Sequence, residues 1–367
     1  MTRPLMRRQL ARRSWSKTAC AVAVLAVLAA ACGSDAKTGA TTTVTSTASA
    51  PETTPVPTSP ASATSAPSDV ATTAAAAVDT LPVDTASPTT DLPTSPPFET
   101  ATMSETFVDT SRPTVPLSGP QLPSRTIDTT IVYPQGSGPF PLIVMSHGIG
   151  GAPKGYTVLS GVWASLGYVV ALPAFPLTND RAPGAETNLF DGVNQPKDVS
   201  FVIDQLLGLN GDDKSPLFGR IDADRIGVAG HSFGAATTYA LTFAGCCRDP
   251  RIKAVVILAG LIFIDPDNND FSRPLPILIM HGDADTTLNI ALDTAVYPQL
   301  AGPKWFVTLL GANHSSPFVN GHSKWTKIVH DTTSDFWNGT LGNDPSSLQT
   351  LRTDAVVAGV STLESSP

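Results

Sequence analysis

The sequence predicts an α/β fold in which helices cover both faces of a mostly parallel central sheet. Short apolar runs, largely β-branched, recur along residues 104–361, and strands that are apolar throughout are typical of a sheet buried on both faces. Between these runs, apolar residues recur at helical spacing, most clearly over 199–207. About 260 residues from Ser104 onward is the size of one large α/β domain. A fold class alone does not give a function.

The first 31 residues predict export. A basic, polar segment over 1–18 precedes one apolar run, 19–31, which is too short to span a bilayer but typical of a signal peptide. Small residues lead to Cys32, and this pattern resembles the lipobox of bacterial lipoproteins, in which the cysteine becomes the lipid-bearing N-terminus. We therefore expect lipidation at Cys32. An ordinary signal peptide cut near Ala31 is the alternative, and the sequence leaves Sec and twin-arginine export both open.

Residues 32–103 are expected to form a disordered tether. Of the 60 residues from 41 to 100, 46 are Ala, Ser, Thr or Pro, so the segment cannot bury enough apolar surface to offset the entropy of ordering it. With lipid on Cys32, the tether would hold the folded domain, residues 104–361, off the outer face of the cell membrane. Without the lipid, the protein would be secreted.

Within the folded domain the expected elements follow one another in a regular order. Residues 106–109 and 126–133 predict an antiparallel edge. Helices are expected through 158–166, over 199–207, directly after Ser232 and near the C-terminus, where His322 and His330 lie. The expected buried strands are 142–145, 168–172, 226–229, 254–258, 277–280 and 305–309.

The most informative motif is Gly-His-Ser-Phe-Gly over 230–234. It is a G-x-S-x-G pattern between an expected strand and an expected helix, which is the context that a nucleophile elbow requires. The chain must reverse so sharply that side chains at Gly230 and Gly234 would collide. Ser232 is thereby presented at the carboxyl end of a strand and the N-terminus of a helix, where developing negative charge is favoured. Ser232 is the candidate nucleophile.

A serine hydroxyl needs a base, and the order Ser, Asp, His places base and acid downstream. His314 follows the strand 305–309 after a glycine turn and is the candidate base. Asp285 follows the strand 277–280 and is the candidate acid. Asp283 is the alternative acid, or a residue that pins the turn.

The oxyanion that develops on the substrate needs preformed donors. One is expected to be the backbone N–H of Phe233, directly after the nucleophile. The other is expected from the glycine-rich loop 146–151, with the N–H of Ile149 the best candidate and Gly148 adjacent. The side chain of His147 is expected to orient this loop.

Together these motifs resemble the α/β-hydrolase family across most of 104–345. Within it, the chain is similar to the capless subgroup of platelet-activating-factor acetylhydrolase-like enzymes, chlorophyllase-like esterases and polyester-degrading cutinases. The resemblance implies nucleophile, acid and base at Ser232, Asp285 and His314, with oxyanion donors at Ile149 and Phe233. Polyester hydrolases usually carry an aromatic residue and Met at these last two positions. Only residues 260–275 separate the expected strands 254–258 and 277–280, so we expect no large cap domain and an open cleft.

An acidic stretch and a pair of adjacent cysteines are two further features of the folded domain. The acidic stretch 265–270 lacks the glycine and distal glutamate of a calcium loop, so we expect a solvated loop. Cys246 and Cys247 are adjacent, and in an exported protein we favour a vicinal disulfide over two thiols. No metal ion and no cofactor are expected.

The sequence therefore predicts a serine hydrolase that cleaves carboxylic esters with small to medium acyl or lipid-like groups through an acyl-enzyme. Net charge argues against nucleic acid as a partner: removing the leader with its 6 basic residues leaves 23 − 6 = 17 against 31 acidic residues, a net charge of −14. A monomer is expected. The alternatives are a surface binding protein that keeps the fold without turnover, and an acyltransferase or peptidase with the same triad. The natural substrate and its acyl-chain length stay open.

Overall fold

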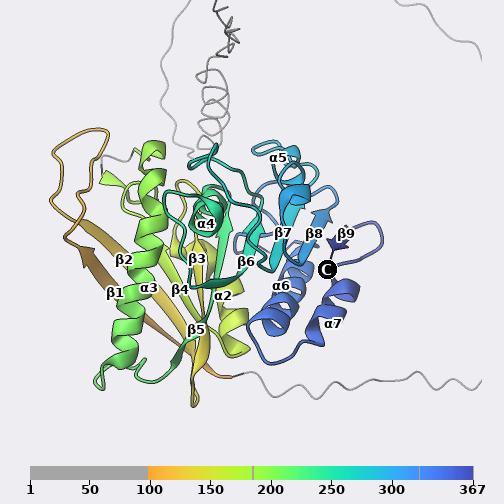
Figure 1. Ribbon diagram of the computed structural model, residues 1–367, viewed down its shortest axis with the longest axis horizontal. Coiled ribbons are helices and arrows are strands. Elements are labelled where there is room, and N and C mark those ends of the chain that lie inside the picture. The colour runs from red at the N-terminus through yellow and green to blue at the C-terminus, as the bar shows by residue number, and fades with distance from the viewer. Residues whose placement is uncertain (1–97, 184–185, 322, 367) are drawn as a thin grey trace, which may run out of the picture. The chain divides into compact units, whose positions relative to one another are not determined.

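The computed structural model describes residues 98–183, 186–321 and 323–366 (Figure 1). The expected leader, the lipidation site at Cys32, most of the expected tether and His322 lie outside these residues. The described part forms one sheet, in the order β1-β2-β4-β3-β5-β6-β7-β8-β9. None of its helices is long and apolar enough to cross a membrane.

Six central strands run parallel, and antiparallel strands complete both edges. The parallel set is β3 (Phe140–Ser146), β4 (Val169–Ala174), β5 (Ile221–His231), β6 (Ile252–Leu258), β7 (Ile277–Gly282) and β8 (Lys304–Leu309). The edge strands are β1 (Thr100–Asp109), β2 (Arg125–Pro134) and β9 (Ser361–Ser366). Every residue of β3, β4 and β7 is buried, as expected for strands covered on both faces.

Helices pack on both faces of the sheet (Figure 1). Side chains of β3 alternate between the two cores: Leu142 and Val144 join the core that holds α3 and α4, while Ile143 and Met145 join the core that holds α2 and α6. The helices are η1 (Pro153–Tyr156), α2 (Thr157–Ser165), η3 (Leu189–Asn194), α3 (Gln195–Gly211), α4 (Phe233–Phe243), α5 (Ala291–Thr294), η4 (Tyr297–Gln299), α6 (Thr326–Thr340) and α7 (Ser347–Asp354).

The ordered sheet extends beyond the expected limits 104 and 361 at both ends. β1 begins at Thr100 because the segment pairs with β2 as far as Pro134 and packs the half-buried Met103 against the core. β9 pairs with β8 along its whole length, although its sequence is mostly small and polar. Edge strands are held mainly by backbone hydrogen bonds, so the apolar pattern that indicates inner strands is weak there.

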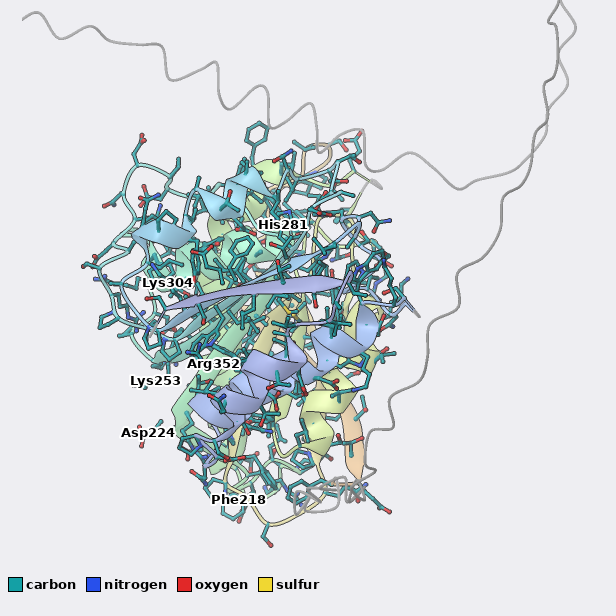
Figure 2. The ribbon with its side chains drawn as sticks, turned by 90° about the vertical axis from the view of Figure 1, so that its right-hand side faces the viewer. Phe218, Asp224, Lys253, His281, Lys304 and Arg352 are labelled. Atoms are coloured by element: carbon teal, nitrogen blue, oxygen red, sulfur yellow. A yellow bond between two sulfur atoms is a disulfide. The ribbon has the colours of Figure 1, made fainter. Side chains whose placement is uncertain are left out.

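Residues 259–276 connect β6 to β7, and this segment contains no helix. No large cap domain is therefore inserted between these two strands. Figure 2 shows the polarity of the sheet: His281, at the end of β7, lies toward the upper edge, while Asp224 and Lys253, near the starts of their strands, lie toward the lower one. The upper edge is therefore where loops after parallel strands converge.

Candidate active site

The turn after β5 presents Ser232 in a strained conformation. Its φ of 57° and ψ of −121° lie outside the regions that non-glycine residues favour. Ser232 occupies the N-cap position of α4. The flanking glycines allow this turn, because a Cβ at Gly230 would overlap the carbonyl of Gly234, and a Cβ at Gly234 would overlap the carbonyl of Ser146. The 230–234 motif therefore forms the tight strand–turn–helix that its sequence predicts.

The structure brings Ser232, His314 and Asp285 into one line of hydrogen bonds. Nε2 of His314 lies 2.7 Å from Oγ of Ser232, and Nδ1 of His314 lies 2.6 Å from Oδ2 of Asp285. The three residues follow β5, β8 and β7, so neighbouring strands position them at the same sheet edge. Asp283, the alternative acid, instead accepts the backbone N–H of Gly311 at 2.6 Å and fixes the start of the loop that carries His314.

Asp285 is held as a carboxylate. Burial alone would raise its pKa, but hydrogen bonds from His281 and His314, with the amide of Leu288, outweigh burial and hold the pKa of Asp285 well below its usual range. Its second oxygen accepts from the amides of Thr287 at 2.8 Å and Leu288 at 2.9 Å. The carboxylate is thus fixed in orientation and ready to accept the Nδ1–H of His314.

The loop after β3 leaves one amide available near Ser232. The N–H groups of Gly148, Gly150 and Gly151 donate to Tyr156 Oη, Thr178 O and Gly148 O, respectively. In the part of the chain that the structure describes, the amides of Ile149 and Phe233 donate to no protein acceptor. Both are thus available to a substrate oxygen.

His147 holds this loop in place. Its Nδ1 lies 2.8 Å from the carbonyl of Gly148, and its Nε2 accepts the backbone N–H of Phe175 at 3.1 Å. A carbonyl only accepts, so Nδ1 carries the proton and the ring is neutral. Burial accordingly lowers the pKa of His147 to about 4.

His231 and Tyr156 are parts of the site that sequence reasoning did not single out. Nε2 of His231 donates to the carbonyl of His314 at 2.9 Å, and Nδ1 accepts from Tyr156 Oη at 2.8 Å. Tyr156 Oη in turn accepts the amide of Gly148. These hydrogen bonds link the glycine-rich loop 146–151, the turn at 230–234 and the loop that carries His314. Burial, with the positive charge on a protonated His314, lowers the pKa of His231 to about 3, so it stays neutral. Only its position next to Ser232 offered a sequence signal.

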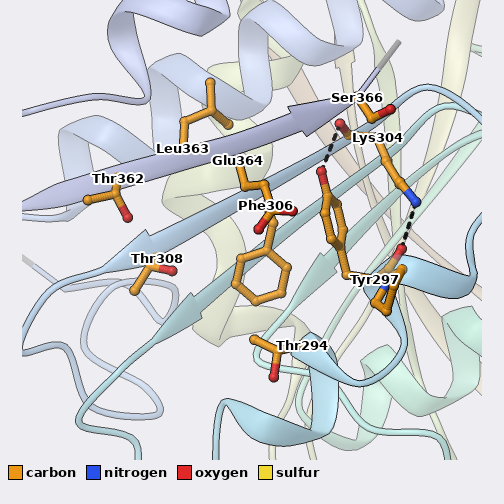
Figure 3. A pocket seen from close by; sticks show the side chains of 10 residues that line it. Thr294, Tyr297, Lys304, Phe306, Thr308, Thr362, Leu363, Glu364 and Ser366 are labelled. Atoms are coloured by element: carbon orange, nitrogen blue, oxygen red, sulfur yellow. Dashed lines mark hydrogen bonds between the residues drawn. The ribbon is translucent and has the colours of Figure 1, made fainter.

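A pocket of about 200 Å³ opens beside the triad. Ser232 and His314 line it together with residues 148–152, Thr287 and Val319. A small apolar cluster from three loops, η3 and α4 adjoins it through Ile149 and is formed by Ile149, Leu189, Ala236, Leu261, Phe263 and Leu288. A larger cavity of about 610 Å³ lies along β8 and β9 around Tyr297, Phe306 and Glu364 and contains none of the triad residues (Figure 3). The smaller pocket is therefore the candidate substrate site.

Neither the adjacent cysteines nor the acidic stretch 265–270 is among the residues that line this pocket. Cys246 and Cys247 are joined by a disulfide in the turn after α4. The stretch 265–270 contacts the turn that holds the disulfide: Asp265 accepts from Cys246 N at 3.2 Å, and the exposed Asp270 pairs with Arg248 at 2.9 Å. Across the described ranges, no group of three or more His, Cys, Asp or Glu side chains is arranged to hold a metal ion.

Known proteins show similarity to this chain at three levels. Residues 184–330 match a family model described as PETase, PET hydrolase-like. Cutinase est2 of Thermobifida alba is 27% identical over 193 residues, which is 52% of this chain and 58% of that protein, so the chain spans less than two thirds of that relative's length. A ferulic acid esterase from Streptomyces cinnamoneus aligns with a TM-score of 0.55 at 22% identity, over 72% of this chain and 94% of that one. The fold is the α/β-hydrolase fold, as the sequence predicted.

Proposed function

We propose that this protein is a serine hydrolase that cleaves carboxylic esters. One observation carries the proposal: Ser232 Oγ, the His314 ring and the Asp285 carboxylate form a continuous relay with donor–acceptor distances of 2.7 and 2.6 Å. The similarity to a PET hydrolase-like family model, a cutinase and a ferulic acid esterase supports ester cleavage over the other reactions that this triad performs.

The geometry gives each residue a role in the proposed reaction. His314 Nδ1–H donates to Asp285, so its Nε2 lone pair faces Ser232 and takes the hydroxyl proton as Oγ attacks the acyl carbon. The amides of Ile149 and Phe233 stabilise the oxyanion, and the proton on His314 then passes to the leaving alcohol. Water, activated by the same imidazole, releases the acid from the acyl-enzyme and regenerates Ser232.

The size of the pocket favours small acyl groups. At about 200 Å³ it is below the range of roughly 300–1,000 Å³ that is typical of sites for drug-sized ligands. The adjoining apolar cluster around Ile149 and Phe263 would extend the site for somewhat longer chains. Lipidation at Cys32, which lies outside the described residues, is part of the proposal and would place this site at the outer face of the membrane.

An active-site probe and a matched pair of serine variants test the proposal. A fluorophosphonate should label Ser232 in the full-length protein. Ser232→Ala should not be labelled, and its kcat on nitrophenyl acetate should fall by at least about 10³-fold. Ser118→Ala, at an exposed serine in the loop between β1 and β2, should keep both. Full esterase activity in folded Ser232→Ala would refute the assignment.

A chain-length series then tests the substrate class. With nitrophenyl esters, kcat/KM should be highest from acetyl to butyryl and about tenfold or more lower for octanoyl. Adding alcohol acceptors separates hydrolysis from acyl transfer. Folded protein that neither binds the probe nor cleaves any ester of the series would favour a binding protein without turnover.

A further inference from the structure

A second histidine, besides His314, contacts the carboxylate of the candidate acid. His281 ends β7, is fully buried, and lies toward the upper edge of the sheet (Figure 2). Its Nε2 is 3.3 Å from Oδ2 of Asp285, the same oxygen that Nδ1 of His314 approaches at 2.6 Å. Two imidazole rings therefore share one carboxylate oxygen.

The partners of His281 require a proton on both ring nitrogens. Nε2 lies 2.8 Å from the carbonyl of Leu288, which can only accept, so Nε2 must donate, and its N–H is shared with the longer contact to Asp285. Nδ1 lies 2.8 Å from Oδ2 of Asp293. That carboxylate already accepts the amide of Gly260 at 2.8 Å on Oδ2 and the Tyr239 hydroxyl at 2.8 Å on Oδ1. Both of these groups donate to Asp293, so its side chain acts as an acceptor and Nδ1 of His281 donates to it as well.

These contacts close a ring through the helix of the nucleophile. Tyr239 lies on α4, the helix that Ser232 caps, and Asp293 lies on α5. The line of polar contacts runs from Ser232 through His314, Asp285, His281 and Asp293 to Tyr239, and α4 joins its two ends. The described members of this line other than His314 are almost completely buried.

We propose that His281 is a positioning residue: a buried imidazolium, held by Asp293, that fixes the carboxylate of Asp285 and moderates its charge toward His314. The proposal rests on the proposed function. Burial opposes the charge on His281, but hydrogen bonds to Asp285 and Asp293 outweigh burial and raise its pKa to about 9. The ionisable groups around it are Asp285, Asp293, Tyr239 and, more remotely, His314 and His231.

The charge has a defined consequence for catalysis. A cation in contact with Asp285 opposes the arrival of a second proton on His314, so the base stays free to act at lower pH. Removing the cation leaves the full charge of Asp285, and that of Asp293 behind it, to favour protonated His314. The acidic limb of the rate profile should then move to higher pH.

Two variants test this in the full-length enzyme. His281→Gln removes the ring, and Asp293→Asn removes the anion that keeps the ring charged. Both should retain fluorophosphonate labelling of Ser232, lose about tenfold in kcat/KM at pH 6.5, and shift the acidic limb upward by about one pH unit. His330→Gln, a matched substitution on α6, should leave the profile unchanged. An unshifted acidic limb in both folded variants would overturn the proposal.

A second measurement needs neither activity nor a folded variant. In ¹⁵N-histidine-labelled wild-type protein, both ring nitrogens of His281 should show the shifts of an imidazolium at pH 7.5, and the ring should lose its proton only near pH 9. A neutral ring at pH 7.5 would overturn the proposal. Loss of ester cleavage in wild type would refute the proposed function, whereas this spectrum decides the state of His281 in either case.

Discussion

The backbone at Ser232 is strained, and the proposed role of this residue as nucleophile accounts for the strain. A φ of 57° disfavours any residue with a Cβ, and neighbouring glycines make the turn possible without removing this strain. Ser232→Gly should therefore be more stable than Ser232→Ala by about 1 kcal/mol, because glycine relieves the strain by more than it adds to the entropy of the unfolded chain. Both variants lack the hydroxyl, so both should be inactive. Urea unfolding of the pair measures the difference, and equal midpoints would show that the turn is relaxed.

At this scale, the sequence predicts residues whose role depends on local order and misses those whose role depends on distant partners. Ser232, Asp285 and His314 could be selected because each follows a recognisable strand. His231 and His281 adjoin the same motifs, but their protonation states follow from Tyr156, Leu288 and Asp293, which no local pattern connects to them. Asp283 shows the reverse case, since a carboxylate beside the acid serves the turn.

Among the elements, a buried arginine joins the edge of the sheet to the segment that supports the site. Arg125, at the start of β2, is fully buried and makes paired hydrogen bonds of 2.6–2.9 Å to Asp191 of η3 and Asp198 of α3. Gly192, next to Asp191, packs directly against the ring of Phe233, whose amide is a candidate oxyanion donor. The ion cluster thus helps to hold η3 against the ring of Phe233.

Removing this arginine should be costly because two buried carboxylates would lose their paired partner, leaving Asp198 only its contact to Arg112 at 2.8 Å. Arg125→Ala is expected to lower the free energy of unfolding by about 3–5 kcal/mol, and Arg125→Lys should recover only part of it, since an ammonium cannot bind both carboxylates in paired fashion. Arg181→Ala is the matched control, because its contact to Asp128 is 3.8 Å long and exposed, and the loss there should stay below about 1 kcal/mol. Urea midpoints compare the three, and a small loss for Arg125→Ala would show that the cluster is dispensable.

Inner and edge elements differ in how well the sequence predicts them. The six parallel strands carry apolar side chains on both faces, so composition alone marks them. Leu363 is the only large apolar residue of β9. The position of β9 depends on the open edge of β8, which exists only once the sheet is assembled. The start of β1 at Thr100 was obscured for the same reason, since its exposed face continues the Thr-rich composition of the preceding segment.

For the whole molecule, buried ionisable groups predict a stability maximum near pH 6.5. His147 and His231, with pKa values of about 4 and 3 in the fold, are neutral there but take up protons on unfolding below pH 6.5, so their contribution is lost as pH falls from 6.5 toward 3. His281, with a pKa of about 9, contributes fully below pH 6.5 and loses its contribution as pH rises to 9. Each such proton changes the free energy of unfolding by about 1.4 kcal/mol per pH unit.

Asp335 on α6 opposes the gain in stability as pH rises from 4 to 7, and it supplies the test. Burial, and the negative charges of Asp354, Asp331 and Asp344, raise its pKa to about 7, so ionised Asp335 destabilises the fold increasingly from pH 4 up to pH 7. Asp335→Asn should therefore raise the thermal midpoint at pH 8 by the equivalent of about 1 kcal/mol, after allowing for solvent screening at this half-buried position, and by less at pH 5. Thermal unfolding of wild type and variant from pH 4 to 10 measures both effects. A wild-type midpoint that rises steadily to pH 10, or a gain for the variant that is independent of pH, would contradict this account of how the buried charges act together.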